Sequence, residues 1–241
     1  MKREKQLFTM VVPIVLSLFV VTLSGCDKDD DKDPGDDLTG KPTEVVEIYN
    51  PVTMRTWMDR NMGASRAATS LNDPLSYGDL YQWGRAKDGH QLRTSDTTSA
   101  LSTSPQPDHD LFITTMSYQG DWLSTPSNTL WQGVDGENNP CPEGFRLPTI
   151  AEWEDEVESW NNNGGIPAFA SAMKLSMAGG RIYYNGNKDV VGITGLYWTS
   201  NVVNHNALVF LVAVGFDGNY TGTLEEGVER ANGHSVRCIK D

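Results

Sequence analysis

Basic residues and cysteines are both scarce in this chain of 241 residues. It has 19 lysines and arginines against 32 aspartates and glutamates, a formal net charge of −13, and three cysteines. A protein that binds nucleic acid needs a basic face to neutralise phosphates, so the charge balance argues against that class of partner. With 38% hydrophobic residues, seven tryptophans and eight tyrosines, the chain can still form a buried core, which argues against wholesale disorder.

The patterns that mark common catalytic and metal sites are also missing. Neither Cys141 nor Cys238 belongs to a CxxC pair, and no histidine lies at ligand spacing beside either one. No Ser/His/Asp arrangement is visible, because the histidines occur in dissimilar contexts: His90, His109, His205 and His234. The clusters 135–138 and 217–219 could bind calcium through carboxylate and backbone oxygens, but their spacing fits no calcium-loop motif and turn chemistry explains them. We therefore expect no cofactor and no catalytic residue.

The longest apolar run lies at the N-terminus. A basic start at residues 2–5 precedes the apolar stretch 7–21, which is shorter than the ~20 residues of a transmembrane helix and has the shape of a secretory signal. The run ends in Leu-Ser-Gly-Cys at 23–26, which resembles a bacterial lipobox. That resemblance implies cleavage of a signal peptide, residues 1–25, and lipid on Cys26. An ordinary signal peptide or an uncleaved anchor, with an incidental cysteine, is the alternative.

An acidic segment follows the predicted lipidation site. Residues 27–37 contain seven aspartates and two lysines but no large apolar side chain, so we predict that residues 26–43 form a solvated flexible tether. Within it, Lys-Asp-Asp at 28–30 resembles the export signal that sends Bacteroidetes lipoproteins to the outer surface. We therefore expect an outer-membrane lipoprotein, anchored by the acylated Cys26 and exposed at the cell surface. A plain spacer is the alternative.

With Cys26 assigned to lipid, Cys141 and Cys238 remain. An even pair in an exported chain is a candidate disulfide, whereas metal binding or redox catalysis is the alternative. Closing so long a loop would destabilise the unfolded state by about 4–5 kcal/mol in the chain-entropy model. The bridge would also fasten the last predicted strand to a point near the middle of the sequence.

Periodicity and turn residues predict one α+β domain from about residue 44 to the end, with antiparallel sheet dominant. Residues 44–49 and 53–59 are predicted to form a hairpin that turns at Asn50-Pro51. The apolar segment 207–214 is predicted to be a central buried strand. Further predicted strands are 174–177, 181–184, 196–200 and 235–239. A long loop is predicted over 91–135, which is rich in serine and threonine.

The clearest predicted helix begins at Thr149. Thr149 and Glu152 have the spacing of a capping box, and a stop is expected at 161–165, which contains three asparagines and two glycines. Apolar residues recur on one helical face at Ile150, Trp153, Val157 and Trp160. A second short helix is predicted after Pro167.

Several blocks of the chain occur in the order found in one family. They are TWMDRNMGA (56–64), GDLYQWGR (78–85), DGH (88–90), NPCPEGFRLPT (139–149), AGGR (178–181), YWTS (197–200) and SVRC (235–238). Over residues 44–241 the chain resembles the Fibrobacter succinogenes major paralogous domain. The resemblance implies a C-type-lectin-like fold, shared with formylglycine-generating enzymes: mostly antiparallel short strands, one or two helices, long irregular loops, neighbouring termini and a Cys141–Cys238 bridge. Members of the family are mostly exported surface proteins.

Two activities found on similar folds lack their residues here. Formylglycine-generating enzymes hold copper with a closely spaced cysteine pair near the C-terminus, where this chain has only Cys238. Calcium-dependent lectins use a proline-flanked motif, which Gln106-Pro107-Asp108 resembles, but at the wrong place in the chain order. The Trp-Asn-Asp motif of those lectins is absent. A shared fold does not imply a shared function, so we expect neither activity, although an oxidoreductase remains the less favoured enzymatic alternative.

The function expected from these observations is a non-catalytic surface module for adhesion or recognition, which binds a glycan or a protein. The alternative is an accessory or tip subunit of a pilus-like assembly. Aromatic residues in or beside the long loop are ligand candidates if they are exposed, and core residues otherwise: Trp83, Tyr118, Trp122 and Trp131. Asp88 and His90 flank a glycine in a turn, where they either bind a ligand or fix the base of the loop. Thr97, in Asp-Thr-Thr, resembles an O-glycosylation site of Bacteroidetes exported proteins.

Overall fold

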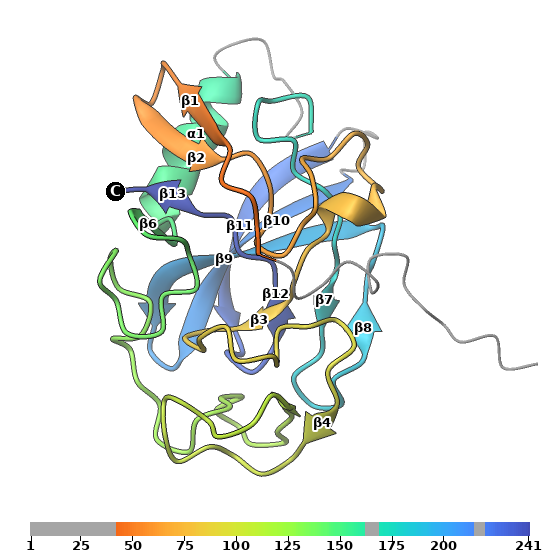
Figure 1. Ribbon diagram of the computed structural model, residues 1–241, viewed down its shortest axis with the longest axis vertical. Coiled ribbons are helices and arrows are strands. Elements are labelled where there is room, and N and C mark those ends of the chain that lie inside the picture. The colour runs from red at the N-terminus through yellow and green to blue at the C-terminus, as the bar shows by residue number, and fades with distance from the viewer. Residues whose placement is uncertain (1–41, 162–168, 215–219) are drawn as a thin grey trace, which may run out of the picture. The chain divides into compact units, whose positions relative to one another are not determined.

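The structure is a computed structural model that describes residues 42–161, 169–214 and 220–241 (Figure 1). The predicted signal peptide, Cys26 and almost all of the tether lie outside these residues. The predicted stop of the helix at 162–165, the start of the second predicted helix and the 217–219 cluster also lie outside them. Among the described residues, no helix is long and apolar enough to cross a membrane.

Short strands make up most of the regular structure. The strands are β1 (Glu47–Asn50), β2 (Arg55–Met58), β3 (Tyr81–Gln82), β4 (Thr97–Thr98), β5 (Phe112–Ile113), β6 (Phe145–Arg146), β7 (Gly180–Arg181), β8 (Lys188–Asp189), β9 (Thr194–Val203), β10 (Asn206–Val214), β11 (Tyr220–Val228), β12 (Gly233–His234) and β13 (Ile239–Lys240). The helices described are α1 (Ile150–Asn161) and the 3₁₀ turn η2 (Pro74–Ser76). Among the strand pairs of the described residues, only β4 and β5 are parallel. The architecture is therefore α+β and rich in strands, in small open sheets that are mostly antiparallel.

The longest strands form one antiparallel sheet in the order β11-β10-β9. The predicted central strand is confirmed, because β10 pairs on both sides: Phe210 lies opposite Tyr197 of β9 and Leu224 of β11. The sequence did not predict β11, whose residues YTGTLEEGV include two threonines, two glutamates and two glycines. Pairing with the apolar β10 compensates for this weak local preference.

The core lies on both faces of this sheet. Successive residues of a strand point to opposite faces, and Tyr197 and Trp198 accordingly belong to two separate hydrophobic clusters. On the Tyr197 face, Trp153 of α1 stacks on Phe210, with ring centroids 4.4 Å apart. Helix α1, which the 3.6-residue periodicity predicted, therefore packs on one face of the sheet.

The capping box at the start of α1 is confirmed. The backbone N–H of Thr149 donates to the carboxylate of Glu152 at 2.8 Å, and the N–H of Glu152 donates to the Thr149 hydroxyl at 3.3 Å. Trp153 and Trp160 are buried, as the predicted apolar face requires, and Ile150 and Val157 are half-buried. Glu152 also accepts from Arg55 at Oε1 and from Arg146 at both carboxylate oxygens, which explains how a buried carboxylate is tolerated.

The two ends of the domain meet in one sheet, in the order β1-β2-β13-β6. The predicted hairpin is confirmed by the antiparallel pairing of β1 and β2, and Ile239 of β13 lies opposite both Trp57 and Arg146. The Cys141–Cys238 disulfide is present beside this ladder. The bridge and the ladder thus hold the C-terminal segment to the same mid-sequence region.

Three of the smaller predicted strands are wrong in whole or in part. Residues 174–177 form no strand, because Lys174 has a φ of 46° and the Met177 N–H bonds to a loop carbonyl. The segment predicted at 181–184 is a strand only at Arg181, and within 235–239 only Ile239 is a strand residue. Ser235 instead makes an isolated parallel bridge with Tyr197. Residues 175–177 and 235–239 are buried, but isolated contacts with loops take the place of a regular ladder.

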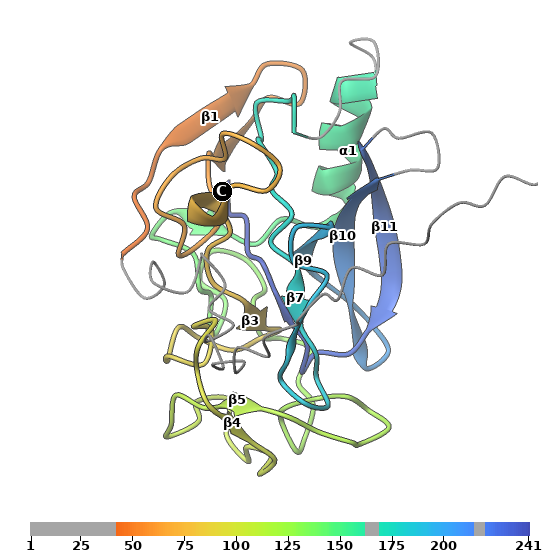
Figure 2. The ribbon, with the colours of Figure 1, turned by 90° about the vertical axis from the view of Figure 1, so that its right-hand side faces the viewer.

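Helix α1 and the loops around β4 and β5 lie at opposite ends of the described domain, as the two views show (Figures 1 and 2). The second predicted helix is absent from the part that the structure describes, since residues 169–173 form turns. The end around β4 and β5 has long segments without regular structure, and most of the predicted site residues belong to it.

Candidate ligand-binding site

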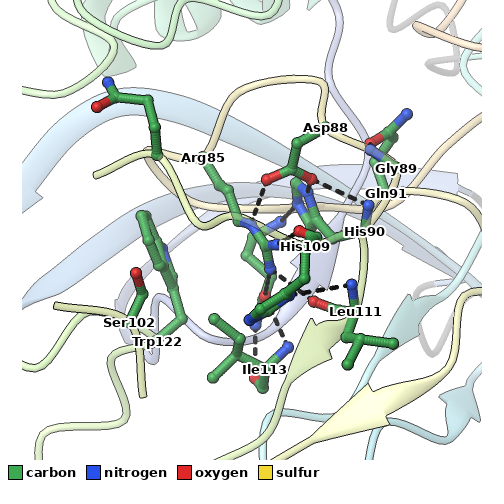
Figure 3. Close-up of polar contacts among 12 residues, drawn as sticks. Arg85, Asp88, Gly89, His90, Gln91, Ser102, His109, Leu111, Ile113 and Trp122 are labelled. Carbon is green, nitrogen blue, oxygen red and sulfur yellow. Dashed lines mark hydrogen bonds and ion pairs between the residues drawn. The ribbon is translucent and has the colours of Figure 1, made fainter. Parts of the chain in front are cut away.

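The long loop folds around the buried guanidinium of Arg85 (Figure 3). Its Nε donates to Asp88 at 2.7 Å, its Nη1 to the Gln82 side chain and to the carbonyl of Leu111 at 2.9 Å each, and its Nη2 to the carbonyl of His109 at 3.0 Å. A planar guanidinium can satisfy several fixed acceptors at once. We call these residues, together with His90, the Arg85 network; it ties the loop to β3.

Asp88 and His90 belong to this network. His90 is fully buried, its Nε2 accepts from the backbone N–H of Gln82 at 3.1 Å, and its Nδ1 lies 2.6 Å from Asp88. Because Nε2 accepts, the neutral ring carries its proton on Nδ1 and donates it to Asp88. Burial lowers the pKa of His90 to about 4, although Asp88 acts in the opposite direction.

This arrangement resembles the Asp–His half of a catalytic triad but leaves no nitrogen for substrate. A general base must reach the proton that it removes, whereas Nε2 of His90 is occupied by a backbone N–H. Burial raises the pKa of Asp88, but the His90 hydrogen bond and the charge of Arg85 outweigh it and leave that pKa lowered. Both side chains fix the base of the loop, which was the alternative to a ligand role.

The three candidate tryptophans are core residues and not exposed aromatics. Trp83, Trp122 and Trp131 are each at most 1% exposed. Each indole N–H donates to a backbone carbonyl, of Thr199, Trp83 and Asn138 respectively. The loop folds over them, so they are core residues, which was the alternative to an exposed ligand surface.

The acidic turn at 135–138 is also structural. The side chain of Asn138 donates to the carbonyls of Gly84 and Pro105 at 2.8 Å each, and Gln106 donates to Glu137 and Asn138. Turn chemistry thus uses most of the polar groups that could have bound calcium. Across 42–161, 169–214 and 220–241, no group of three or more histidine, cysteine or acidic side chains is placed to hold a metal ion.

Thr97 is exposed on β4, opposite Phe112 of β5. Its side chain is accessible to a modifying enzyme, as an O-glycosylation site requires. Gly186 packs against it, since a β-carbon there would lie 2.5 Å from Thr97 Cγ2.

A polar pocket of about 340 Å³ lies beside Tyr118. Tyr118 is fully exposed, and it is the one predicted aromatic candidate that reaches solvent. The pocket is lined by Tyr118, Gln119, Asn204, His205, Asn206 and Glu229. Its volume is at the lower end of the range for small-molecule sites. We call it the Tyr118 pocket.

Three segments distant in sequence build the Tyr118 pocket. Tyr118 and Gln119 come from the long loop, residues 204–206 form the tip of the β9–β10 hairpin, and Glu229 follows β11. Asn204 takes a left-handed φ of 57°, which asparagine tolerates better than most residues. The pairing of β10 shifts register between Ala207 and Val209, directly inside the tip. Such bulges redirect a strand and occur next to functional sites.

Glu229 is held from two sides. The side-chain N–H of Asn232 donates to its Oε2 at 3.1 Å, while Asn232 Oδ1 accepts from the backbone of Tyr183 at 3.0 Å. Gly120 packs against the other side, since a β-carbon there would lie 2.3 Å from Glu229 Cγ. The carboxylate is thereby oriented, while within the described residues no donor bonds to Oε1.

The remaining polar side chains of the pocket are unused. Within the part of the chain that the structure describes, no hydrogen bond involves the side-chain atoms of Gln119, Asn204, His205 or Asn206, or the Tyr118 hydroxyl. Amides, an imidazole and a carboxylate offer both donors and acceptors. The pocket therefore presents an aromatic ring and a set of available hydrogen-bonding groups.

A second pocket, of about 300 Å³, lies between the β1–β2 turn and α1. The described residues that line it are Val52, Thr53, Asp155, Glu158 and Ser159, none of which is aromatic. Beneath it, burial raises the pKa of Glu156, which accepts from Asn50 and Trp160. This pocket has no group comparable to Tyr118, so we do not treat it as the ligand site.

Sequence reasoning named Tyr118 but missed the hairpin tip and Glu229. The signal available for the tip was Asn-His-Asn at 204–206 between two predicted strands. Nothing in the sequence pointed to Glu229. Gly120, which packs against it, lies more than 100 residues away in the chain.

No family model, no curated protein and no solved structure was found to match the chain.

Proposed function

We propose that this protein is a lipid-anchored recognition module of the bacterial cell surface, which binds its ligand at the Tyr118 pocket. The domain is assigned to the C-type-lectin-like fold and to the major paralogous family. Supporting this are the hairpin near its start paired with the C-terminal β13, the single described α-helix, and the Cys141–Cys238 bridge. The lipobox-like 23–26 segment and the acidic tether support the anchor at Cys26.

The observation that carries the proposal is a fully exposed tyrosine beside unbonded polar side chains. Exposed large aromatics at a polar rim are typical of recognition surfaces. Loops on a rigid scaffold commonly carry such sites, and here the scaffold is the β9–β10 sheet with the disulfide-linked C-terminal segment.

The direct test is ligand binding by the purified full chain, offered arrays of glycans and of surface proteins. We expect one ligand whose binding falls at least tenfold in Tyr118→Ala. Tyr49→Ala, which removes another exposed tyrosine on β1, is the matched control and should bind normally. Equal binding by both variants would reject the Tyr118 pocket as the ligand site.

The anchor is tested separately in cells. Cys26→Ser should move the protein from the membrane fraction to the soluble fraction, because several acyl chains are needed for stable anchoring. Protease treatment of intact cells should degrade the wild-type domain. Membrane retention of Cys26→Ser would contradict lipidation, and full protection from protease would contradict surface exposure.

Glycosylation at Thr97 is a further expectation for an exported protein with this exposed residue. The intact mass should exceed that of the polypeptide, and Thr97→Ala should remove the excess. Thr98→Ala, at the half-buried neighbouring position, is the control. An intact mass equal to that of the polypeptide would reject the site.

A further inference from the structure

The chemistry of the Tyr118 pocket selects among ligand classes, given the proposed function on which this inference rests. Its aromatic surface is one tyrosine ring, which is fully exposed and makes no ring contact with another described residue. A single exposed ring suits a flat apolar face of matching size, and a hexose offers such a face through its axial C–H groups. A hydrophobic peptide would need a larger apolar lining than this pocket has.

The polar lining suits hydroxyl groups. Oε1 of Glu229 is an acceptor, the amides of Gln119, Asn204 and Asn206 offer both donors and acceptors, and His205 adds a ring nitrogen. A sugar hydroxyl both donates and accepts, so it can use such a mixed set. A site built to bond hydroxyls discriminates strongly against ligands that lack them, because its polar groups would then be left unpaired.

The charge of the pocket argues against anionic ligands. Among the described residues that line it there is no lysine or arginine, and Glu229 contributes a negative charge. The nearest arginine in sequence, Arg230, is 1% exposed and faces the core, where its guanidinium lies over the Trp83 ring and bonds the carbonyl of Ser127. The chain as a whole carries a net charge of −13. Sialylated, sulfated and uronic acid glycans would therefore meet repulsion.

We propose that the Tyr118 pocket binds an uncharged sugar ring, a hexose or an N-acetylhexosamine, without calcium. Tyr118 stacks on the ring face, Glu229 accepts from a hydroxyl, and the amides of the hairpin tip bond neighbouring hydroxyl or acetamido groups. The volume of about 340 Å³ limits the site to a small part of a glycan, so a terminal residue is the expected determinant.

The test uses the full chain in a detergent without a sugar headgroup, on an array of neutral, N-acetylated, sialylated, sulfated and uronic acid glycans. We expect binding to at least one uncharged glycan, competition by its methyl glycoside, and no change with EDTA. Tyr118→Ala should weaken binding at least tenfold, Tyr118→Phe no more than threefold, and Glu229→Gln by about fivefold or more. Tyr49→Ala should match the wild type.

Three results would overturn the inference. Preference for acidic glycans would reject the charge argument, and loss of binding with EDTA would reject a calcium-independent site. A protein ligand that depends on Tyr118, with no glycan bound, would reject the sugar but leave the recognition function standing. The absence of any ligand that depends on Tyr118 would reject both.

Discussion

The Arg85 network and the Tyr118 pocket both involve the long loop, yet they use their polar groups in opposite ways. In the network, the guanidinium meets a carboxylate, an amide and two carbonyls, and His90 has a partner at each nitrogen. In the pocket, Glu229 is the one lining residue whose side chain bonds another described residue. Burial explains the difference, since an unpaired buried polar group is costly whereas an exposed one is bonded by water.

This contrast separates structural from recognition residues more sharply than residue type does. Histidines and acidic residues occur in both regions, and the sequence offered the network members Asp88 and His90 as ligand candidates. What distinguishes the regions is whether the hydrogen-bonding capacity is already used. Removing a network residue should therefore reduce stability, whereas removing a pocket residue should reduce only binding.

Arg85→Met is expected to have the largest effect on stability. It leaves Asp88 partly buried without its cation and the carbonyls of His109 and Leu111 without a donor. We expect a loss of about 3–5 kcal/mol in the free energy of unfolding, measured by urea denaturation at pH 7. Arg85→Lys keeps the charge but not the planar fork, so its loss of stability should be smaller than that of Arg85→Met but still measurable. A loss below about 1 kcal/mol for Arg85→Met would contradict the structural role of the Arg85 network.

Acidification should also destabilise the domain through its buried histidines. Burial lowers the pKa of His90 to about 4 and that of His234 to about 3, against about 6.5 in an unfolded chain. Between pH 6.5 and those values the unfolded state binds more protons than the folded state, so stability falls as the pH falls.

Between pH 7 and pH 5 we expect the two histidines to lower the free energy of unfolding by about 2–4 kcal/mol together. Urea denaturation at the two pH values measures this. His90→Gln should reduce the pH dependence. A pH dependence that is the same in the wild type and in His90→Gln would contradict the assignment to His90.

Gly120→Ala should affect both stability and the pocket. Gly120 has a φ of 57°, and an added β-carbon would lie 2.3 Å from Glu229 Cγ. The left-handed conformation alone costs about 1–2 kcal/mol, and the clash should displace Glu229. Gly133→Ala is the matched control, because Gly133 has a φ of 73° but no atom within 4 Å of an added β-carbon. Both variants should lose stability in urea denaturation, but only Gly120→Ala should lose ligand binding.

Tyr118→Ala should have the smallest effect on stability. A fully exposed side chain with no packing partner contributes little, so the free energy of unfolding should change by less than about 0.5 kcal/mol. The same variant should lose ligand binding. A large loss of stability would show that Tyr118 is structural and would remove the contrast between the two regions.

The local features of the fold were readable from the sequence where one strong signal dominated. The capping box at Thr149, the apolar face of α1, the β1–β2 hairpin and the central strand β10 are all confirmed. The small strands failed where tertiary contacts replaced regular pairing, as at residues 174–177. Strand β11 was missed because its glycines and polar residues carry no strand pattern, and its stability comes from pairing with β10.

The candidate site was predictable only in part, and the failures share one cause. Trp83, Trp122 and Trp131 were named with Tyr118 because all are aromatic and lie in or near one loop, but the loop buries three of them and exposes the fourth. Exposure depends on how the loop folds over Arg85, which no local pattern encodes.

The sequence by itself determined the charge of the protein, its capacity for a core, the capped helix, the hairpin and the availability of Cys141 and Cys238 for a bridge. Those features follow from composition and from contacts between residues close in the chain. The tertiary structure alone decided that Arg85 consumes the polar groups of the loop base, and that Tyr118, the hairpin tip and Glu229 converge on one pocket. Convergence of segments about 100 residues apart is set by packing of the whole domain, because such contacts are stable only when the core between them has formed.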